Sequence, residues 1–236
     1  MGVIKMRLTT LYRLLFLMFS LSCQHPGVLF DQPMPVQASA NFSFPDTLLG
    51  RWSAVLPDTT YNPGPPMRVV QSTTNLIISS KLMYTQAQTI SEGPIIFLDT
   101  VDGGKYKNRK LLDEELKSIG GKMDFLQNHF RFFTEFNDTL FVIDKINHLR
   151  KSDHYWVLNR RDAHHKAWIL GWMYLRNDTL GFMYPTRADS LKITKHVSSN
   201  NIRIRNDGFI ELHVSDSAFK QLLDLDWNNR RFYVRQ

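Results

Sequence analysis

The densest group of side chains able to do chemistry lies at residues 160–165, where the sequence reads Arg-Arg-Asp-Ala-His-His. A histidine close to an aspartate can act as a general acid or base, or can bind a metal ion. However, adjacent histidines on an extended chain point in opposite directions, and the sequence has no Cys/His spacing typical of a zinc site. We therefore interpret His164 and His165 as part of an exposed loop between two strands.

Common catalytic motifs are absent from the sequence. It contains no Gly-x-Ser-x-Gly, no phosphate-binding glycine loop and no His-Glu-x-x-His. Outside the 160–165 cluster, the histidines at 148, 154, 196 and 213 stand singly beside expected strands. The sequence thus predicts no catalytic residue, no metal and no cofactor, and a non-enzymatic role is favoured. The alternative is a periplasmic hydrolase that uses scattered His, Asp and Ser residues.

The first 22 residues have the pattern of a secretory signal peptide. Lys5, Arg7 and Arg13 precede an apolar run over residues 14–21, and a basic start followed by a short apolar run is typical of such leaders. A membrane-spanning helix needs roughly 18 or more apolar residues, which is far longer than this run. We therefore expect residues 1–22 to be removed on export.

Cys23, the single cysteine of the chain, follows this leader directly. The sequence Leu21-Ser22-Cys23 resembles the lipobox of bacterial lipoproteins, although Ser20 stands where leucine is usual. The resemblance implies that Cys23 is lipidated and anchors the protein in the cell envelope, facing the periplasm. Ser20 and Ser22 also suit an ordinary signal peptidase, which leaves a soluble periplasmic or secreted protein as the alternative.

The charge balance makes nucleic acid an unexpected partner. The leader carries three of the cations and no acid, so the formal charge of +7 falls to +4 in the mature chain. Cationic clusters lie at residues 105–110, 160–166 and 230–231, and aromatic residues lie within or beside them. Cations interleaved with aromatics are also found in proteins that bind single-stranded nucleic acid. An exported protein rarely meets nucleic acid. Anionic lipid headgroups or acidic glycans fit this charge better.

Two parts of the mature chain are predicted to differ in character. Residues 24–45 hold four prolines among Gln, Ser, Ala and Asn, and proline both fixes one backbone angle and removes a donor. We expect residues 23–45 to be the anchor site and an extended tether. Residues 46–236 are expected to form a single β-rich domain.

The stretch 155–185 is predicted to be the centre of that domain. Trp168, Leu170, Trp172 and Tyr174 alternate with a second apolar series, and aromatic residues at a spacing of two favour a strand. Asn and Asp at 177–178 tolerate the left-handed backbone of a tight turn. Because both series are apolar, we expect an antiparallel hairpin that is buried on both faces.

Gly50-Arg51-Trp52 resembles the Gly-x-Trp motif on the first strand of lipocalins. In that family the tryptophan closes one end of a ligand-holding barrel, and a late basic residue packs on it. The family's Thr-Asp-Tyr motif is absent from this chain. The resemblance implies a barrel, but the tryptophan would equally suit a plain core position.

The remaining elements follow from local patterns. Strands are expected at 46–55, 67–71, 75–79, 82–85, 94–99, 125–136, 138–143, 190–195, 202–205, 209–214 and 231–235. Good helix formers that end at Gly120-Gly121 predict a helix over 109–119, with Leu112, Leu116 and Ile119 on its apolar face. Ser215 is expected to cap a second helix that ends near residue 225.

Together these patterns predict a mainly β fold, an antiparallel meander that closes as a lipocalin-like barrel or sandwich with one or two short helices. The preferred function is a binding module for a small apolar ligand or for an envelope protein. Candidate pocket-lining residues are the large aromatics Trp52, Trp168, Trp172 and Phe182. An aromatic-lined cavity would favour the small ligand, and a filled core beside an apolar patch would favour the protein partner.

Overall fold

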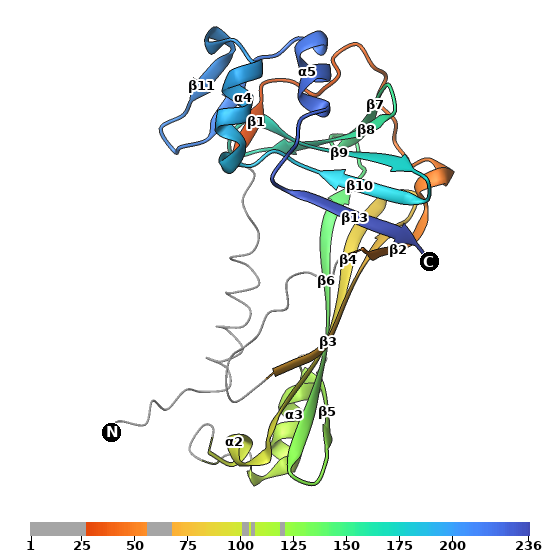
Figure 1. Ribbon diagram of the computed structural model, residues 1–236, viewed down its shortest axis with the longest axis vertical. Coiled ribbons are helices and arrows are strands. Elements are labelled where there is room, and N and C mark those ends of the chain that lie inside the picture. Colours follow the sequence, from red (N-terminus) through yellow and green to blue (C-terminus); the bar gives the residue numbers. More distant parts are fainter. Residues whose placement is uncertain (1–26, 56–67, 101–103, 105–106, 119–120) are drawn as a thin grey trace. The chain divides into compact units, whose positions relative to one another are not determined.

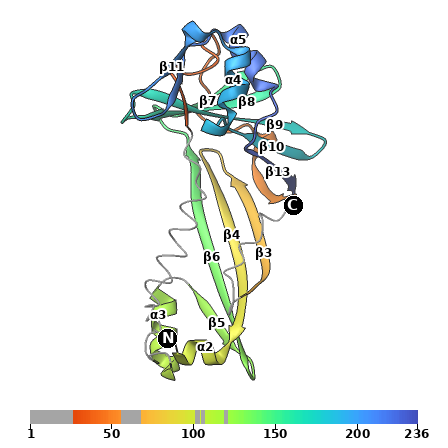
Figure 2. The ribbon, with the colours of Figure 1, turned by 60° about the vertical axis from the view of Figure 1, so that its left-hand side comes forward.

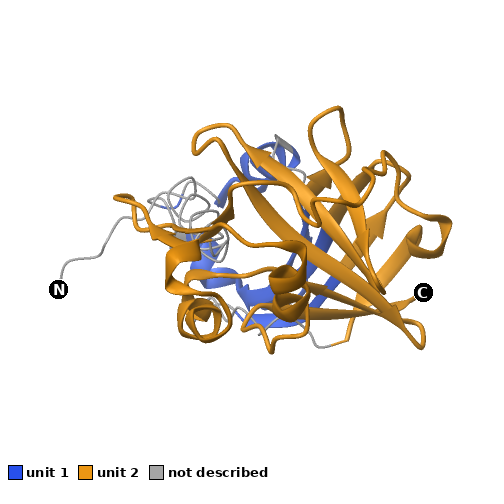
Figure 3. Cartoon of the chain, turned by 90° about the horizontal axis from the view of Figure 1, so that it is seen from above, with its two compact units in different colours: residues 1–23, 56–74, 86–137 blue, residues 24–55, 75–85, 138–236 orange. Residues whose placement is uncertain are grey.

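The computed structural model describes residues 27–55, 68–100, 104, 107–118 and 121–236. These residues divide into two compact units, coloured separately in Figure 3. Unit 1 contains residues 68–74 and 86–137 of the described chain, and unit 2 contains residues 27–55, 75–85 and 138–236. The expected mainly β fold is confirmed, with chiefly antiparallel pairing. The described residues form four α-helices where one or two were expected.

Unit 2 is built on a sheet in which neighbouring strands pair in the order β11-β12-β1-β9-β10-β13-β2-β3, while β7 and β8 extend the other edge of β9 (Figure 1). Strand β1 pairs with β12 in parallel. The strands are β1 (Val28–Phe30), β2 (Gly50–Ala54), β3 (Arg68–Ile78), β4 (Leu82–Pro94), β7 (His148–Ser152), β8 (Tyr155–Asp162), β9 (Ala167–Arg176), β10 (Thr179–Met183), β11 (Ile202–Ile204), β12 (Ile210–Leu212) and β13 (Arg230–Arg235).

The predicted central hairpin is confirmed as β8, β9 and β10. Trp172 pairs with Val157 on one side and with Met183 on the other. Asn177 and Asp178 have φ of 48° and 59°, which is the left-handed turn expected there. Gly181 lies opposite Tyr174, whose ring would come within 2.5 Å of a β-carbon at that position. Glycine is therefore required for the tyrosine to lie flat across the sheet.

Both faces of this hairpin are buried, because alternate residues join different core clusters. Leu170 and Trp172 belong to cluster 1, which also includes Phe30 and Phe219. Met173 belongs to cluster 2. Most members of cluster 2 come from β2, β3, β4, β6 (His129–Val142), β7, β8, β9, β10 and β13. The sheet of unit 2 therefore surrounds a filled interior, but it does not close as was expected, so it fits an open barrel or a sandwich.

Cluster 1 is covered by helices α4 (Ser190–His196) and α5 (Asp216–Leu223), seen above β9 in Figure 2. The helix expected near 216–225 is confirmed, and Ser215 caps it by accepting from the backbone N–H of Ala218. The strand expected at 190–195 is wrong, because this stretch is α4. Helix α4 directly follows a short 3-10 helix, Arg187–Asp189, whose start carries a capping box formed by Thr186 and Asp189.

The expected tether is wrong from residue 28 onward. Val28, Leu29 and Phe30 form β1 and are fully buried. The carboxamide of Asn159 holds Met34 at both ends, accepting from its N–H at 2.7 Å and donating to its carbonyl at 2.9 Å. Side chains thus replace the ladder bonds that prolines cannot make, so this segment packs on unit 2.

Two further side chains secure the same segment. Nη1 of Arg150 donates to the carbonyl groups of Pro33, Pro35 and Val36 at 2.7–3.2 Å. The carboxylate of Asp216 accepts from the N–H groups of Val36 and Gln37. The segment over residues 31–37 is therefore bound at several points to residues more than a hundred positions away in sequence.

Unit 1 is a smaller sheet in the order β3-β4-β6-β5, with β5 (Lys122–Phe125) and β6 (His129–Val142), and with helices α2 (Ile95–Thr100) and α3 (Arg109–Ser118). Strands β3, β4 and β6 contribute residues to both units. Leu112 and Leu116 of α3 pack with Leu98 and Phe130. Helix α3 was predicted, and Ile119 of its expected face lies outside the described residues. The strand expected at 94–99 is wrong, because α2 occupies it.

Several shorter predictions change in detail. The expected strands at 67–71 and 75–79 are one strand, β3. The strands expected at 125–136 and 138–143 do not break at residue 137, because β6 runs without interruption from His129 to Val142, and Phe125 instead ends β5. The expected first strand begins only at Gly50, because Asp46–Leu48 forms a short 3-10 helix. Strands β11, β12 and β13 agree with prediction within about two residues.

Candidate functional site

The four aromatics predicted to line a ligand pocket fall into two groups. Trp52 and Phe182 lie together in cluster 2, the filled interior of the open barrel. Trp172 lies in cluster 1, and Trp168 is partly buried against that cluster. Each of the four thus contacts a packed core, and the structure does not bring all four to one site.

Trp52 packs against a basic residue of β13. The guanidinium carbon of Arg235 lies 4.5 Å from the centroid of the Trp52 ring. The indole Nε1 of Trp52 donates to the carbonyl of Leu48 at 3.0 Å. The guanidinium of Arg235 thus covers the Trp52 ring, and the indole N–H of Trp52 is satisfied by the backbone.

The polar cluster at 160–165 is more ordered than an exposed loop. His165 has a side chain that is 10% exposed, and its Nδ1 lies 2.9 Å from Oδ2 of Asp162. Its Nε2 lies 3.3 Å from Oδ2 of Asp207, in the turn between β11 and β12. His164 is exposed and lies edge-on to His165. One histidine of the pair is thus a link between two turns, and the other is a surface residue.

The carboxylates of this link stay ionised at neutral pH. Burial pushes the pKa of Asp162 upward, but hydrogen bonds from the His165 ring and from the backbone of His164 and His165 outweigh it, so the pKa lies below its ordinary value. Burial also raises the pKa of Asp207. The backbone N–H of Phe209 and the charges of Arg205 and His165 outweigh burial, so the pKa of Asp207 lies below its ordinary value. Because both ring nitrogens of His165 face carboxylates, neither is directed at a hydroxyl or thiol, as the histidine of a Ser–His or Cys–His nucleophile pair is.

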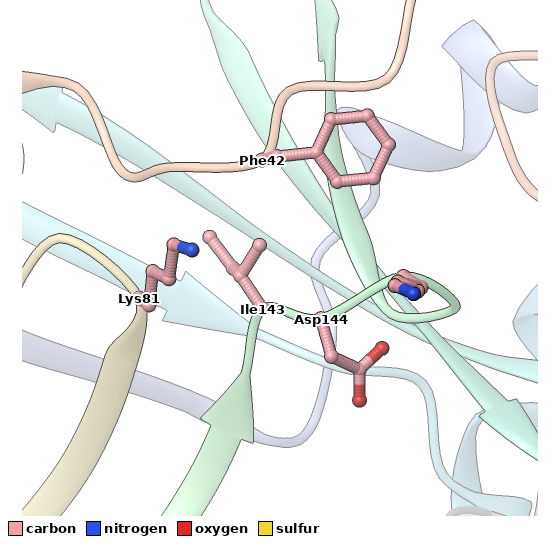
Figure 4. Close-up of a pocket in the computed structure, with 5 residues that line it drawn as sticks. Phe42, Lys81, Ile143 and Asp144 are labelled. Carbon is pink, nitrogen blue, oxygen red and sulfur yellow. The ribbon is translucent and has the colours of Figure 1, made fainter.

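A cavity of about 460 Å³ lies in unit 2, lined by Phe42, Lys81, Ile143, Asp144 and Lys145 (Figure 4). Its lining is chiefly apolar, and it is a shallow hollow that is largely open to solvent. Ligand pockets in proteins commonly have volumes of about 300–1,000 Å³. This cavity is therefore large enough for part of a small molecule.

The apolar surface of the cavity connects with the barrel interior. Ile143 is 3% exposed and belongs to cluster 2, while Phe42 is 54% exposed and stands above it (Figure 4). An apolar group bound between these two side chains would contact the edge of the core. It would also cover the exposed ring of Phe42.

Backbone hydrogen bonds hold the three walls of the cavity in place. The N–H of Ile143 donates to the carbonyl of Lys81 at 2.8 Å, and the N–H of Phe44 donates to Ser80 at 2.8 Å. Asn41 and Leu149 exchange two further bonds at 2.7 and 3.1 Å. The cavity is thus formed by segments already fixed in the fold, which lowers the cost of binding.

The charge of the cavity is positive. The carboxylate of Asp144 points away from Phe42 (Figure 4) and accepts from the N–H groups of Ile146 and Asn147 at 2.7 and 2.6 Å. These bonds lower the pKa of Asp144, and the bond from the backbone of Asn147 has the largest effect. Asp144 is therefore used by its own turn, whereas Lys81 and Lys145 are exposed at the rim.

Sequence reasoning missed this site. Phe42 lies in the stretch predicted to be a tether, and Ile143 is the last residue of the strand expected at 138–143. The one available signal was the run Asp144-Lys-Ile-Asn147, which is typical of a turn held by its own aspartate. That pattern predicts a rigid turn, but it does not predict a ligand.

Cys23, the predicted lipidation site, lies outside the described residues. Within the described ranges, no group of three or more His, Cys, Asp or Glu side chains is arranged to hold a metal ion. None of the described helices is long and apolar enough to cross a bilayer. Comparisons with protein-family models, with curated proteins and with solved structures find no match to this chain.

Proposed function

We propose that this chain is an exported, lipid-anchored protein of the bacterial cell envelope that binds a small apolar ligand carrying an anionic group, without catalysing a reaction on it. The observation that supports this proposal is the cavity between Phe42 and Ile143. It combines an apolar surface continuous with the barrel interior and two lysines at the rim, Lys81 and Lys145. A fatty acid or a similar amphiphile has the matching chemistry.

Binding is tested with a dansyl-labelled undecanoic acid and its methyl ester, followed by fluorescence. The acid should bind and the ester should bind more weakly, because the ester lacks the charge that meets the lysines. Phe42→Ala should reduce the affinity for both probes. Lys81→Ala should reduce the affinity for the acid alone, by up to about fivefold, since an exposed ion pair contributes at most about 1 kcal/mol.

The matched control is Lys195→Ala, which removes an exposed lysine on α4 and changes the net charge by the same amount as Lys81→Ala. It should leave the affinity for the acid unchanged. Equal weakening by Lys81→Ala and Lys195→Ala would mean that the probe senses net charge only. Binding that is unaffected by Phe42→Ala would contradict the proposed site.

The anchor is tested separately by intact mass spectrometry of the mature protein. A chain that begins at Cys23 and is heavier by acyl groups supports lipidation, and Cys23→Ser should then release the protein from membranes. Several acyl chains are needed for stable anchoring, since one chain binds a bilayer only marginally. An unmodified thiol would indicate a soluble periplasmic or secreted protein.

A further inference from the structure

The fold of unit 2 begins close to the predicted anchor. Gly27 already belongs to the packed structure, because its carbonyl accepts from the N–H of Ile210 at 2.9 Å and its α-carbon faces Arg187. Cys23 precedes Gly27 by four positions. Four residues span at most about 14 Å even when fully extended. A lipid on Cys23 therefore holds this end of unit 2 at the bilayer surface.

The residues around Gly27 can be placed from their contacts. A β-carbon at Gly27 would lie 2.5 Å from Cβ of Arg187, and one at Gly208 would lie 3.2 Å from Nη1 of the same arginine. Arg187 therefore lies between the start of β1 and the turn that joins β11 to β12. Leu191 follows it by about one helical turn at the start of α4.

Ile204 lies at the same end of the sheet. It pairs with Ile210, which in turn pairs with Val28. Since neighbouring strands are about 4.8 Å apart, Ile204 is about 10 Å from Val28. Ile204 and Leu191 are each 76% exposed, the largest exposed fractions among the large apolar side chains of the described residues.

The charges at this end favour an anionic surface. Arg187, Arg203 and Lys166 are exposed cations. The nearby carboxylates are engaged within the protein, Asp162 and Asp207 with His165, and Glu211 with Arg205. Exposed apolar side chains beside unpaired cations are the combination that binds an anionic lipid interface.

We infer that the end of unit 2 carrying Arg187, Leu191, Arg203 and Ile204 is a bilayer-contact surface that meets anionic headgroups. The inference rests on the anchor of the proposed function. It goes beyond that anchor in fixing which face of unit 2 lies on the membrane. Leu191 and Ile204 enter the headgroup region, and Arg187 and Arg203 contact lipid phosphates.

The test couples the mature chain, residues 23–236, through the thiol of Cys23 to a maleimide-bearing lipid in vesicles that contain phosphatidylglycerol. Hydrogen–deuterium exchange then compares coupled protein with protein whose thiol is blocked, in the presence of the same vesicles. Coupling should slow exchange in peptides covering 187–192 and 203–206. The turn at 177–178, at the opposite end of β9, should exchange as before.

The double variant Leu191→Asp with Ile204→Asp supplies the matched control, because both side chains are exposed and the fold should tolerate the changes. It should couple normally but lose the protection at 187–192 and 203–206. Unchanged exchange on coupling, or protection at the 177–178 turn instead, would overturn the inference. Because coupling is chemical, this result is separate from acylation in the cell, whose absence would contradict the proposed anchor.

Discussion

The guanidinium of Arg235 in β13 packs against the ring of Trp52 in β2, with 4.5 Å between the guanidinium carbon and the ring centroid. Nη2 of Arg235 also donates to the carbonyl of Thr47. The two residues are directly paired across the antiparallel strands β13 and β2. A cation–π contact therefore adds to the backbone pairing between β13 and β2.

Removing this contact should weaken the barrel slightly. We expect Arg235→Ala to lower the free energy of unfolding by about 0.5–1 kcal/mol, the range for cation–π contacts at exposed sites. Urea unfolding measures the change. Arg176→Ala is the control, since Arg176 is an exposed arginine of β9. Equal effects of the two substitutions would show that the position on Trp52 contributes nothing.

The proline-rich segment should be held chiefly by Asn159. The Asn159 side chain is fully buried and makes two hydrogen bonds to the backbone of Met34. Asn159→Leu leaves that N–H and carbonyl without partners, which we expect to cost about 2–4 kcal/mol, since each unsatisfied group costs about 1–3 kcal/mol. Protease should then cut within residues 31–44 before the rest of unit 2. A parent protein cut there equally fast would restore the tether interpretation.

Local pattern was sufficient for β8, β9 and β10. The alternation of Trp168, Leu170, Trp172 and Tyr174 fixes both the strand and its two buried faces, and Asn177 marks the turn. The same reasoning found α3 and α5, because helix formers and a capping serine are local signals. Elements whose start, end and buried face depend on residues close in sequence could therefore be predicted from the sequence alone.

Long-range contacts decided the remainder. Residues 28–37 read as a tether because their partners, Asn159, Arg150 and Asp216, lie more than a hundred positions away. Residues 95–100 form a short apolar run whose period does not separate helix from strand. The cavity was unpredictable for the same reason, since Phe42, Lys81 and Ile143 meet only after folding.

His148 should make stability depend on pH. Its Nδ1 donates to the carbonyl of Ile146 at 2.7 Å, and its Nε2 accepts from Nε of Arg150 at 3.2 Å. Burial chiefly, with the charge of Arg150, lowers the pKa of His148 below its ordinary value, although the Ile146 bond and Asp144 act in the opposite direction. The unfolded chain therefore takes up this proton first. Stability should be complete above about pH 6.5 and fall as the pH drops toward the folded-state pKa.

The measurement is the urea midpoint at pH 7.5 and at pH 5.5 for the parent protein, His148→Gln and His196→Gln. His196 is an exposed histidine on α4 and serves as the control. The loss between the two pH values should shrink in His148→Gln and persist in His196→Gln. An unchanged loss in His148→Gln would place the responsible group elsewhere.

Trp172 and Trp227 should respond differently to the loss of their indole nitrogens. The two rings meet edge to face at 5.2 Å in cluster 1. Nε1 of Trp227 donates to the carbonyl of Leu222 at 2.9 Å, whereas Nε1 of Trp172 has no hydrogen-bond partner in the described part of the chain. Trp172→Phe should therefore lower the free energy of unfolding less than Trp227→Phe, which removes the indole bond to the Leu222 carbonyl and leaves that carbonyl only backbone donors, among them the N–H of Leu225 at 3.3 Å.

Trp172→Ala should cost about 3–5 kcal/mol, as other large-to-small aromatic changes in protein cores do. Thermal or urea unfolding of Trp172→Ala, Trp172→Phe and Trp227→Phe gives the comparison. A Trp172→Ala variant that melts with the parent would show that β9 is not the centre of unit 2. Equal costs for the two phenylalanine variants would mean that the Leu222 bond adds nothing.

The two adjacent histidines provide the sharpest test of the link between the β8–β9 and β11–β12 turns. We expect His165→Ala to lower the free energy of unfolding by about 1.5–3 kcal/mol, because hydrogen bonds to charged groups contribute about that much. Without the histidine, the carboxylates of Asp162 and Asp207 would also repel each other. His164→Ala should stay within about 0.5 kcal/mol of the parent, as exposed substitutions usually do. Urea unfolding of the two single variants at pH 7 makes the comparison. The original interpretation of both residues as exposed loop requires that neither variant differ from the parent, so equal and negligible effects would remove the link.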